Sequence, residues 1–175
     1  MTAPQLIFLG DSLIEFCDWQ DHFPGHAVVN LGLAGETVQE LRQRVEHLAG
    51  RLENPAWFLL MIGTNNVAVE DYGFFADYRA LVAILRQRHP AAALQVTSLL
   101  PMHLPWLAPE TIPRLNSRLR ELAQDLGAGY VDAYAAFVAR GNTGPFFLDD
   151  GVHLSDAGYT VWAAAIRPFL PHRSR

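Results

Sequence analysis

The sequence predicts an α/β protein in which helices cover both faces of a parallel sheet. Short apolar runs alternate with longer segments of helical spacing along the whole chain, which is typical of parallel strands joined by crossover helices. Most of these runs are continuously apolar rather than alternating, as expected for strands buried on both faces. At 175 residues, the chain fits one domain that spans residues 1–175.

The individual elements follow from the spacing of the hydrophobic residues. These residues recur at intervals of three and four over 36–48, 74–88 and 112–126, which predicts three helices. A last helix is expected to begin at Ser155, a favourable N-cap, and to end near Arg167 because Pro168 follows. The apolar runs predict five strands, at residues 6–9, 27–31, 57–62, 94–99 and 130–131.

Residues 101–109 stand apart because three prolines in nine residues predict a loop after the fourth strand. In an open α/β sheet, loops at the carboxyl ends of strands border the ligand crevice, so we expect this loop to shape the site. Its apolar side chains, together with two phenylalanines further along the chain, could line an acyl pocket or could pack as ordinary core. The candidates are Met102, Leu104, Trp106, Phe146 and Phe147.

The amino-acid composition excludes several classes of partner and mechanism. The formal net charge is −5, with 13 basic and 18 acidic residues and no basic run, so nucleic acid and anionic membrane surfaces are poor partners. All the basic residues are arginine, and the absence of lysine excludes a Walker-type phosphate loop and Schiff-base chemistry. Cys17 has no partner for an internal disulfide. The first residues lack the charge and the apolar length of a signal peptide, and no apolar stretch approaches the roughly 20 residues of a membrane span. We therefore expect a cytoplasmic protein.

Three short motifs follow predicted strands or precede the last helix. Gly10-Asp11-Ser12 comes directly after the first strand, where a tight turn displays the serine and its backbone N–H. Gly63-Thr64-Asn65-Asn66 comes after the third strand, where an asparagine amide could donate to an oxyanion. Each motif alone is equally compatible with an N-cap or a polar turn.

The third motif, Asp150-Gly151-Val152-His153, places a carboxylate and an imidazole three residues apart, on one side of a turn. The carboxylate can then hold Nδ1–H and leave Nε2 free to accept a proton from a serine hydroxyl. Taken alone, the pair could also be an acidic helix start beside a surface histidine. In chain order, however, the motifs supply a nucleophile, a base, its orienting acid and oxyanion donors, which is a complete acyl-transfer set.

With these blocks the sequence resembles the SGNH/GDSL hydrolase family over nearly its whole length. The resemblance implies that Ser12 is the nucleophile, that Asp150 and His153 complete the triad, and that Gly35 and Asn65 join the Ser12 N–H in the oxyanion hole. Gly35 lies in the second block, Asn30-Leu31-Gly32-Leu33-Ala34-Gly35-Glu36-Thr37. The motifs are most similar to the branch of the platelet-activating-factor acetylhydrolase catalytic subunits. Many members have Asp where this chain has Asn66, and the loop after Pro101 has no close counterpart.

The expected architecture is a three-layer α/β/α sandwich with a five-stranded parallel sheet in the flavodoxin-like order 2-1-3-4-5. Ligand should bind at the carboxyl edge, near the switch between strands one and three. Asp11 is expected to contact the substrate beside the nucleophile. Asp149 is the alternative partner of His153, although the Asp-x-x-His spacing favours Asp150.

The predicted activity is that of a serine esterase acting on a small-molecule ester, with short acyl groups such as acetyl as the first choice by family resemblance. No metal or organic cofactor is required, and a homo-oligomer is compatible with the sequence. A thioesterase, a lysophospholipase and a carbohydrate acetylesterase are alternatives within the same fold. A flavodoxin-like domain that binds a phosphate-bearing ligand is the alternative from another class, although the first turn is not glycine-rich and no lysine is available.

Overall fold

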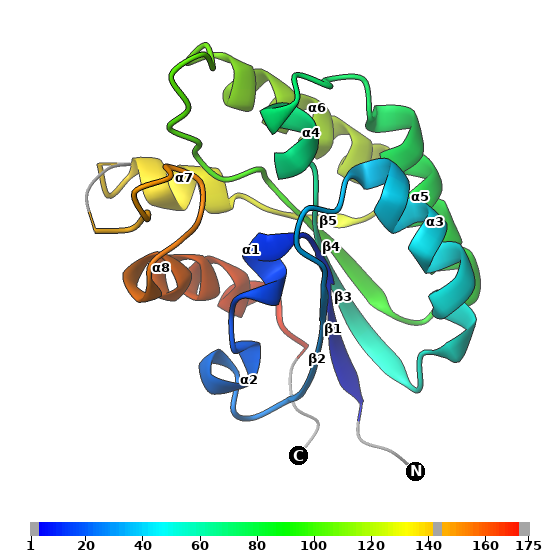
Figure 1. Cartoon of the computed structure of the whole chain (residues 1–175). Helices are drawn as coiled ribbons and strands as arrows, with labels where there is room; N and C mark the ends of the chain where they lie inside the picture. Colours follow the sequence, from blue (N-terminus) through cyan, green and yellow to red (C-terminus); the bar gives the residue numbers. More distant parts are fainter. Residues whose placement is uncertain (1–3, 142–144, 172–175) are drawn as a thin grey trace.

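The computed structural model describes residues 4–141 and 145–171. Within them, the apolar runs form a sheet of five strands that pair in parallel in the order β2-β1-β3-β4-β5 (Figure 1). This order confirms the predicted topology. The strands are β1 (Gln5–Gly10), β2 (Ala27–Gly32), β3 (Pro55–Met61), β4 (Ala93–Thr97) and β5 (Gly129–Val131).

The four predicted helices are present, with bounds shifted by one or two residues. They are α3 (Val38–Leu48), α5 (Phe75–Arg88), α6 (Thr111–Asp125) and α8 (Asp156–Ile166). The sequence did not predict several shorter elements, because one or two turns are too short to show a helical period. These are α1 (Ser12–Glu15), α2 (Trp19–His22), α4 (Thr64–Ala68), α7 (Ala133–Val138) and the 3₁₀ turns η1 (Ala49–Arg51) and η2 (Arg167–Phe169).

Helices cover both faces of the sheet, so the core is divided into two layers. Along β1, Ile7 and Leu9 pack with α3, α5 and α6, whereas Leu6 and Phe8 pack with α1, α2, α7 and α8. Figure 1 shows α3 and α5 on one side of the strands and α1, α2 and α8 on the other. The alternation follows from the two-residue period of a strand, and it confirms the three-layer sandwich.

The fourth strand is shorter than predicted, since residues 94–99 were expected to be extended but β4 ends at Thr97. The side chain of Asn116 explains the difference. Its amide donates to the carbonyl of Leu99 at 2.9 Å, and its oxygen accepts from the N–H of Leu99 at 2.7 Å. A side chain of α6 thus satisfies backbone groups that would otherwise continue the ladder, and it turns the chain into loop 101–109.

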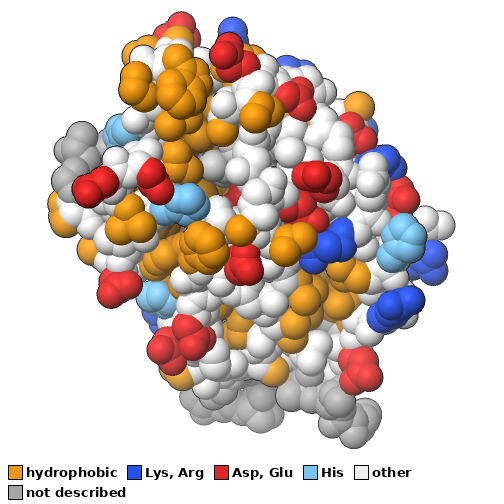
Figure 2. All heavy atoms as spheres, viewed as in Figure 1, with side chains coloured by type: hydrophobic (Ala, Val, Ile, Leu, Met, Phe, Trp, Pro, Cys, Tyr) orange, Lys and Arg blue, Asp and Glu red, His pale blue; other side chains and the backbone are white. Residues whose placement is uncertain are grey.

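The carboxyl ends of β1 and β3 lie side by side, with Gly10 paired to Met61. The strand order changes direction between β1 and β3, and ligand crevices form at such switch points. Figure 2 shows hydrophobic side chains at the surface over the end of α1 and over loop 101–109, with acidic side chains and a histidine between them. In the part of the chain that is described, no helix combines the length and the apolar character needed to span a membrane.

Candidate active site

Ser12 is the first residue of α1 and directly follows the turn after β1. Asp11 is the N-cap of this helix, and its Oδ1 accepts a hydrogen bond from the N–H of Leu13 at 3.0 Å. This cap satisfies a backbone donor that the short helix leaves without a partner. The Gly-Asp-Ser turn therefore fixes where the Ser12 hydroxyl is displayed.

Three side chains from the two ends of the chain form a hydrogen-bonded row. The Oγ of Ser12 lies 2.9 Å from Nε2 of His153, and Nδ1 of His153 lies 2.6 Å from Oδ2 of Asp150. Although Asp149 is adjacent, it is Asp150 that contacts the imidazole, as the three-residue spacing indicates. The structure thus brings together the serine, histidine and aspartate singled out from the sequence.

A tight turn holds Asp150 and His153 together. The second oxygen of Asp150, Oδ1, accepts the N–H groups of Val152 and His153, both at 2.9 Å. Gly151 has a φ of 71° within this turn, and a Cβ there would lie 2.8 Å from the carbonyl oxygen of His103. A side chain at this position would be strained and would also clash, so the turn requires glycine.

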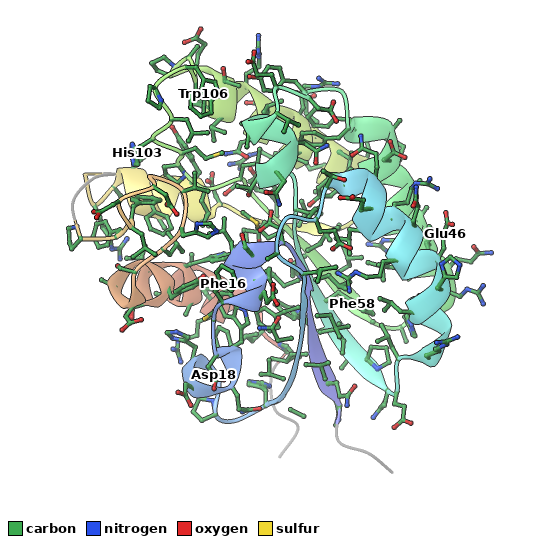
Figure 3. The ribbon with its side chains drawn as sticks, viewed as in Figure 1. Phe16, Asp18, Glu46, Phe58, His103 and Trp106 are labelled. Atoms are coloured by element: carbon green, nitrogen blue, oxygen red, sulfur yellow. The ribbon has the colours of Figure 1, made fainter. Side chains whose placement is uncertain are left out.

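Loop 101–109 supports this turn from behind. The N–H of His103 donates to the carbonyl of Gly151 at 2.8 Å, and the His103 ring packs edge-on against Phe147 with a centroid distance of 4.8 Å. Figure 3 shows His103 beside the turn and α7, whereas Trp106 lies far from Phe16 at the other end of the loop. The prediction that the loop shapes the site thus holds at His103, a residue that the sequence did not single out.

The hydrogen bonds around Asp150 determine its ionisation. Its partial removal from water opposes the charged form, but hydrogen bonds from the His153 ring and from the N–H groups of Val152 and His153 outweigh this effect. Together they hold the pKa of Asp150 below its ordinary value. Asp150 is therefore a carboxylate at neutral pH, as a group that orients an imidazole must be.

The predicted oxyanion donors lie on two loops near Ser12. Gly35 is exposed with a φ of 79°, and Asn65 is the second residue of α4. Within residues 4–141 and 145–171, the backbone N–H groups of Ser12 and Gly35 donate to no protein acceptor. The Nδ2 of Asn65 donates to the carbonyl of Glu36 at 2.9 Å, and because an amide nitrogen has two hydrogens, one stays available.

Buried polar side chains hold these donor loops in place. Glu36 is buried, and both of its oxygens pair with Arg44 of α3 at 2.6 Å. A guanidinium that binds both carboxylate oxygens fixes orientation as well as distance. Arg44 also donates to the carbonyl of Leu31 at 2.9 Å, and Oε2 of Glu15 accepts the N–H of Ala34 at 2.6 Å. The Gly35 loop is thereby tied to β2, α1 and α3.

Asn66 bridges the second donor loop to α3. Its Oδ1 accepts the N–H of Val38 at 2.9 Å, and its Nδ2 donates to Asp71 at 2.7 Å and to Gln39 at 2.8 Å. The Gly73 N–H and the Asn66 amide lower the pKa of Asp71, which is therefore a carboxylate. An aspartate at position 66 would face this charge, so asparagine is the side chain that fits.

The expectation that Asp11 contacts substrate is wrong, because its side chain is fully buried. Burial raises the pKa of this carboxyl to about 6, although the hydrogen bond from the Leu13 N–H and the charge of His153 act in the opposite direction. Asp11 directly precedes Ser12 and caps α1 through the Leu13 N–H. It is a structural part of the site.

The predicted acyl-pocket residues are not gathered around the serine. Met102 and Leu104 line a cavity of about 310 Å³ formed by loop 101–109 and Tyr134, while Phe147 packs on the rings of His103 and Phe137. The cavity that includes His153 in its wall has other lining residues, Phe16, Leu148, Leu154, Ser155, Asp156 and Tyr159. Phe16 was not among the residues selected from the sequence, although it caps the carboxyl end of α1 four residues after Ser12 and therefore lies on the same side of this turn.

Among the described residues, no group of three or more His, Cys, Asp or Glu side chains is arranged to hold a metal ion. The arrangement consists instead of a serine hydroxyl, an imidazole, a carboxylate and unpaired N–H donors at the carboxyl edge of a parallel sheet. The same constellation recurs in serine hydrolases of unrelated folds. This fold and this set of side chains are compatible with a hydrolase built on a parallel α/β sheet.

Comparison with known proteins narrows this class. The profile of the GDSL-like lipase/acylhydrolase family matches residues 8–161, and the chain belongs to this family. It is 30% identical over 181 residues to the bovine platelet-activating factor acetylhydrolase IB subunit alpha1, covering 95% of this chain and 75% of the relative.

Solved structures agree with this assignment. A GDSL-like lipase from Bacteroides thetaiotaomicron is 25% identical, with a TM-score of 0.73 over 97% of this chain and 91% of that one. The acetylxylan esterase Axe2 from Geobacillus stearothermophilus has a TM-score of 0.76 at 23% identity, over 98% of this chain and 97% of that one. The second likeness supports the fold.

Proposed function

We propose that the chain is a serine esterase that cleaves carboxylic esters through an acyl-enzyme, with Ser12, His153 and Asp150 as its triad. The observation that carries the proposal is the row Ser12 Oγ–His153 Nε2–Asp150, with contacts of 2.9 and 2.6 Å. These distances let a proton move from the hydroxyl to the imidazole as the oxygen attacks.

In the proposed reaction, Oγ of Ser12 attacks the ester carbonyl while Nε2 of His153 accepts the hydroxyl proton. Asp150 stabilises the resulting imidazolium, and the N–H groups of Ser12 and Gly35 and the Asn65 amide donate to the oxyanion. The carbon–oxygen bond to the alcohol then breaks, and His153 gives its proton to the departing oxygen. Water releases the acyl group with His153 again acting as the base.

The proposed acyl group is short, with acetyl as the first choice. The relatives support it by their names, since one is an acetylhydrolase subunit and one structural neighbour is an acetylxylan esterase. Thioesters, lysophospholipids and acetylated carbohydrates are the alternative substrates of the same site. Each would use the same nucleophile. They differ in the group that leaves, and a lysophospholipid also carries a long acyl chain.

A binding domain without catalysis is the alternative from another class. Such a domain needs a serine hydroxyl only as a hydrogen-bonding group, whereas a hydrolase needs an activated one. The 2.9 Å contact with His153 and the capped, buried position of Ser12 favour the hydrolase. Covalent labelling by a fluorophosphonate separates the two, since only an activated serine reacts.

The test compares wild type with Ser12→Ala on p-nitrophenyl esters from acetate to octanoate. The variant should lose hydrolysis by on the order of 10⁴-fold or more and should not be labelled, because its nucleophile is missing. In the wild type, activity should fall steeply as the acyl chain lengthens. Full activity in Ser12→Ala would falsify the assignment, and a flat or rising series would exclude the short-chain preference alone.

A further inference from the structure

The cavity beside His153 has a volume of about 520 Å³ and walls that are mainly apolar. Phe16, Leu148, Leu154 and Tyr159 supply these walls, and His153 itself forms part of the lining. The cavity therefore begins at the residue that the proposed reaction uses to move protons. It belongs to the surface over the end of α1 where hydrophobic side chains gather (Figure 2).

The exposed side chain of Phe16 is the feature of this cavity that packing of the folded chain does not explain. Its side chain is 59% exposed, and its ring lies 5.5 Å from the His153 ring at an interplanar angle of 36°. Leu148, in the same lining, is 51% exposed. Burial of such side chains contributes most when they are removed from water, so these two gain most from a ligand that covers them.

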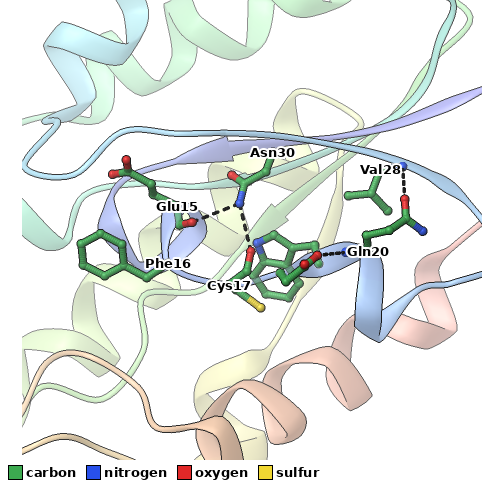
Figure 4. Close-up of a pocket in the computed structure, with 8 residues that line it drawn as sticks. Glu15, Phe16, Cys17, Gln20, Val28 and Asn30 are labelled. Carbon is green, nitrogen blue, oxygen red and sulfur yellow. Dashed lines mark hydrogen bonds between the residues drawn. The ribbon is translucent and has the colours of Figure 1, made fainter.

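The backbone around Phe16 is held firmly in place. Asn30 on β2 donates from Nδ2 to the carbonyl of Ile14 at 2.9 Å, and to those of Glu15 and Cys17 at 3.3 and 3.0 Å. Figure 4 shows the last two bonds. These bonds satisfy carbonyls at the end of α1, which a short helix leaves without partners. The ring of Phe16 is thus presented beside His153 from a fixed backbone.

The chemistry of ester cleavage indicates which part of a substrate would enter this cavity. His153 must give its proton to the alcohol oxygen, so that oxygen lies near Nε2 when the bond to the acyl carbon breaks. The carbonyl oxygen instead faces the donors of Ser12, Gly35 and Asn65. The substituent on the alcohol oxygen therefore extends from His153, where the apolar cavity begins.

Resting on the proposed esterase activity, we propose that this cavity is the alcohol-side subsite and that Phe16 is its specificity-determining residue. It takes neutral esters whose alcohol carries an aryl or alkyl group, which packs against Phe16 and Leu148. The apolar walls favour uncharged alcohols, and the carboxylates disfavour anionic ones, since Asp156 lines the cavity and Asp150 lies behind His153. No lysine or arginine is among the lining residues to offset this repulsion.

The experiment compares two acetates that share an acyl group and have alcohols of similar reactivity, ethyl acetate and 2-phenylethyl acetate. The wild type should prefer the phenylethyl ester in kcat/KM. In Phe16→Ala the ratio of the two kcat/KM values should fall by about tenfold, the magnitude expected when an aromatic contact is lost. Phe16→Leu should keep part of the preference.

A matched control replaces another exposed phenylalanine. Phe169 lies in η2, where its carbonyl accepts the indole N–H of Trp57 near the amino end of β3, so it is far from the nucleophile turn. Phe169→Ala should keep the wild-type ratio. Benzyl acetate should also be cleaved faster than 4-(acetoxymethyl)benzoate, which adds a carboxylate to the same alcohol.

The possible results test the subsite proposal and the esterase proposal independently. Equal losses on both acetates in Phe16→Ala, with fluorophosphonate labelling intact, would overturn the subsite and leave the esterase standing. A ratio that falls as far in Phe169→Ala would also overturn the subsite, as would faster cleavage of the carboxylate ester. A wild type that cleaves neither acetate and resists labelling would overturn the esterase proposal itself.

Discussion

On one side of Ser12, buried polar side chains from distant elements hold the donor loops of Gly35 and Asn65. On its other side, Asp150 and His153 lie on a turn whose side-chain hydrogen bonds come from within a few residues, with one backbone hydrogen bond from His103 of loop 101–109. Glu36 and Asn66 are at most 4% exposed, whereas the Asp150 side chain is 49% exposed. Buried polar networks are costly to disturb, because each lost partner leaves another group unsatisfied.

This difference indicates that the two sides respond differently to substitution. On the histidine side, a change to a functional group should alter the reaction with little effect on folding. On the donor side, substitutions can distinguish residues that would contact the oxyanion from residues that only hold the loops in place. Asn65 would touch the oxyanion, whereas Asn66 binds the backbone of α3 and the side chains of Gln39 and Asp71.

The largest effect after loss of the nucleophile is expected for Asp150→Asn. Asparagine can still accept the N–H groups of Val152 and His153, but its amide would donate to Nδ1 and favour the imidazole tautomer that cannot accept the Ser12 proton. We expect kcat on p-nitrophenyl acetate to fall by about 10²–10⁴-fold, with a Tm close to that of the wild type.

The matched control is Asp149→Asn, which removes the neighbouring carboxylate and should leave kcat little changed. An equal loss of kcat in both variants would mean that the negative charge of the two carboxylates supports the reaction, rather than the hydrogen bond between Asp150 and His153. A large drop in Tm for Asp150→Asn would contradict the view that this side of the site is held locally.

A smaller effect is expected for Asn65→Ala, which removes a donor to the oxyanion. The loss in kcat should be about 10²–10³-fold, with KM changed less. Tm should fall only slightly, because the bond to the Glu36 carbonyl is the one protein contact of the Asn65 amide among the described residues. Asn66→Ala, in contrast, should lower Tm clearly. If the two variants have the same effect on Tm, the division of the donor side into acting and supporting residues is wrong.

The layout of the fold could be predicted because each long element carries its own signal. Continuous apolar runs marked the strands, and three- and four-residue spacing marked α3, α5 and α6. The candidate site could be proposed because the three motifs occur together, in the order of the family that the sequence resembles. Taken alone, each motif was also compatible with a cap or a polar turn. The structure brings Ser12, His153 and Asp150 together at distances of 2.9 and 2.6 Å.

The remaining features depend on contacts between distant segments, which spacing does not reveal. Prolines predicted loop 101–109, but not that the His103 N–H would donate to the carbonyl of Gly151, behind the turn of Asp150 and His153. The sequence also did not predict that the Asn66 amide donates a hydrogen bond to Asp71, because this contact depends on how the chain folds around α4. Phe16 did carry a signal, its position four residues after Ser12, yet a helix as short as α1 was not predicted.

Asp11 is buried next to Ser12. The dependence of protein stability on the ionisation of this carboxyl gives the smallest but most specific prediction. Its pKa is about 6 in the folded protein and near 3.8 when exposed, so the folded state binds the proton more tightly. As pH rises from about 4 to 6, the unfolded chain loses this proton first and stability falls. Above pH 6 the loss of folding stability caused by the charged Asp11 is complete, and it is at most about 3 kcal/mol.

Asp11→Asn should escape this penalty while keeping the oxygen that accepts the Leu13 N–H. We therefore expect its Tm to exceed that of the wild type at pH 8, by about 2–4 °C for each kcal/mol recovered, and the difference to shrink at pH 4. Thermal unfolding of both proteins at the two pH values measures this. A difference that does not change with pH would show that Asp11 is not titrating in this range. A loss of Tm at pH 8 would show instead that the charge of Asp11 stabilises the turn through the Leu13 N–H and His153.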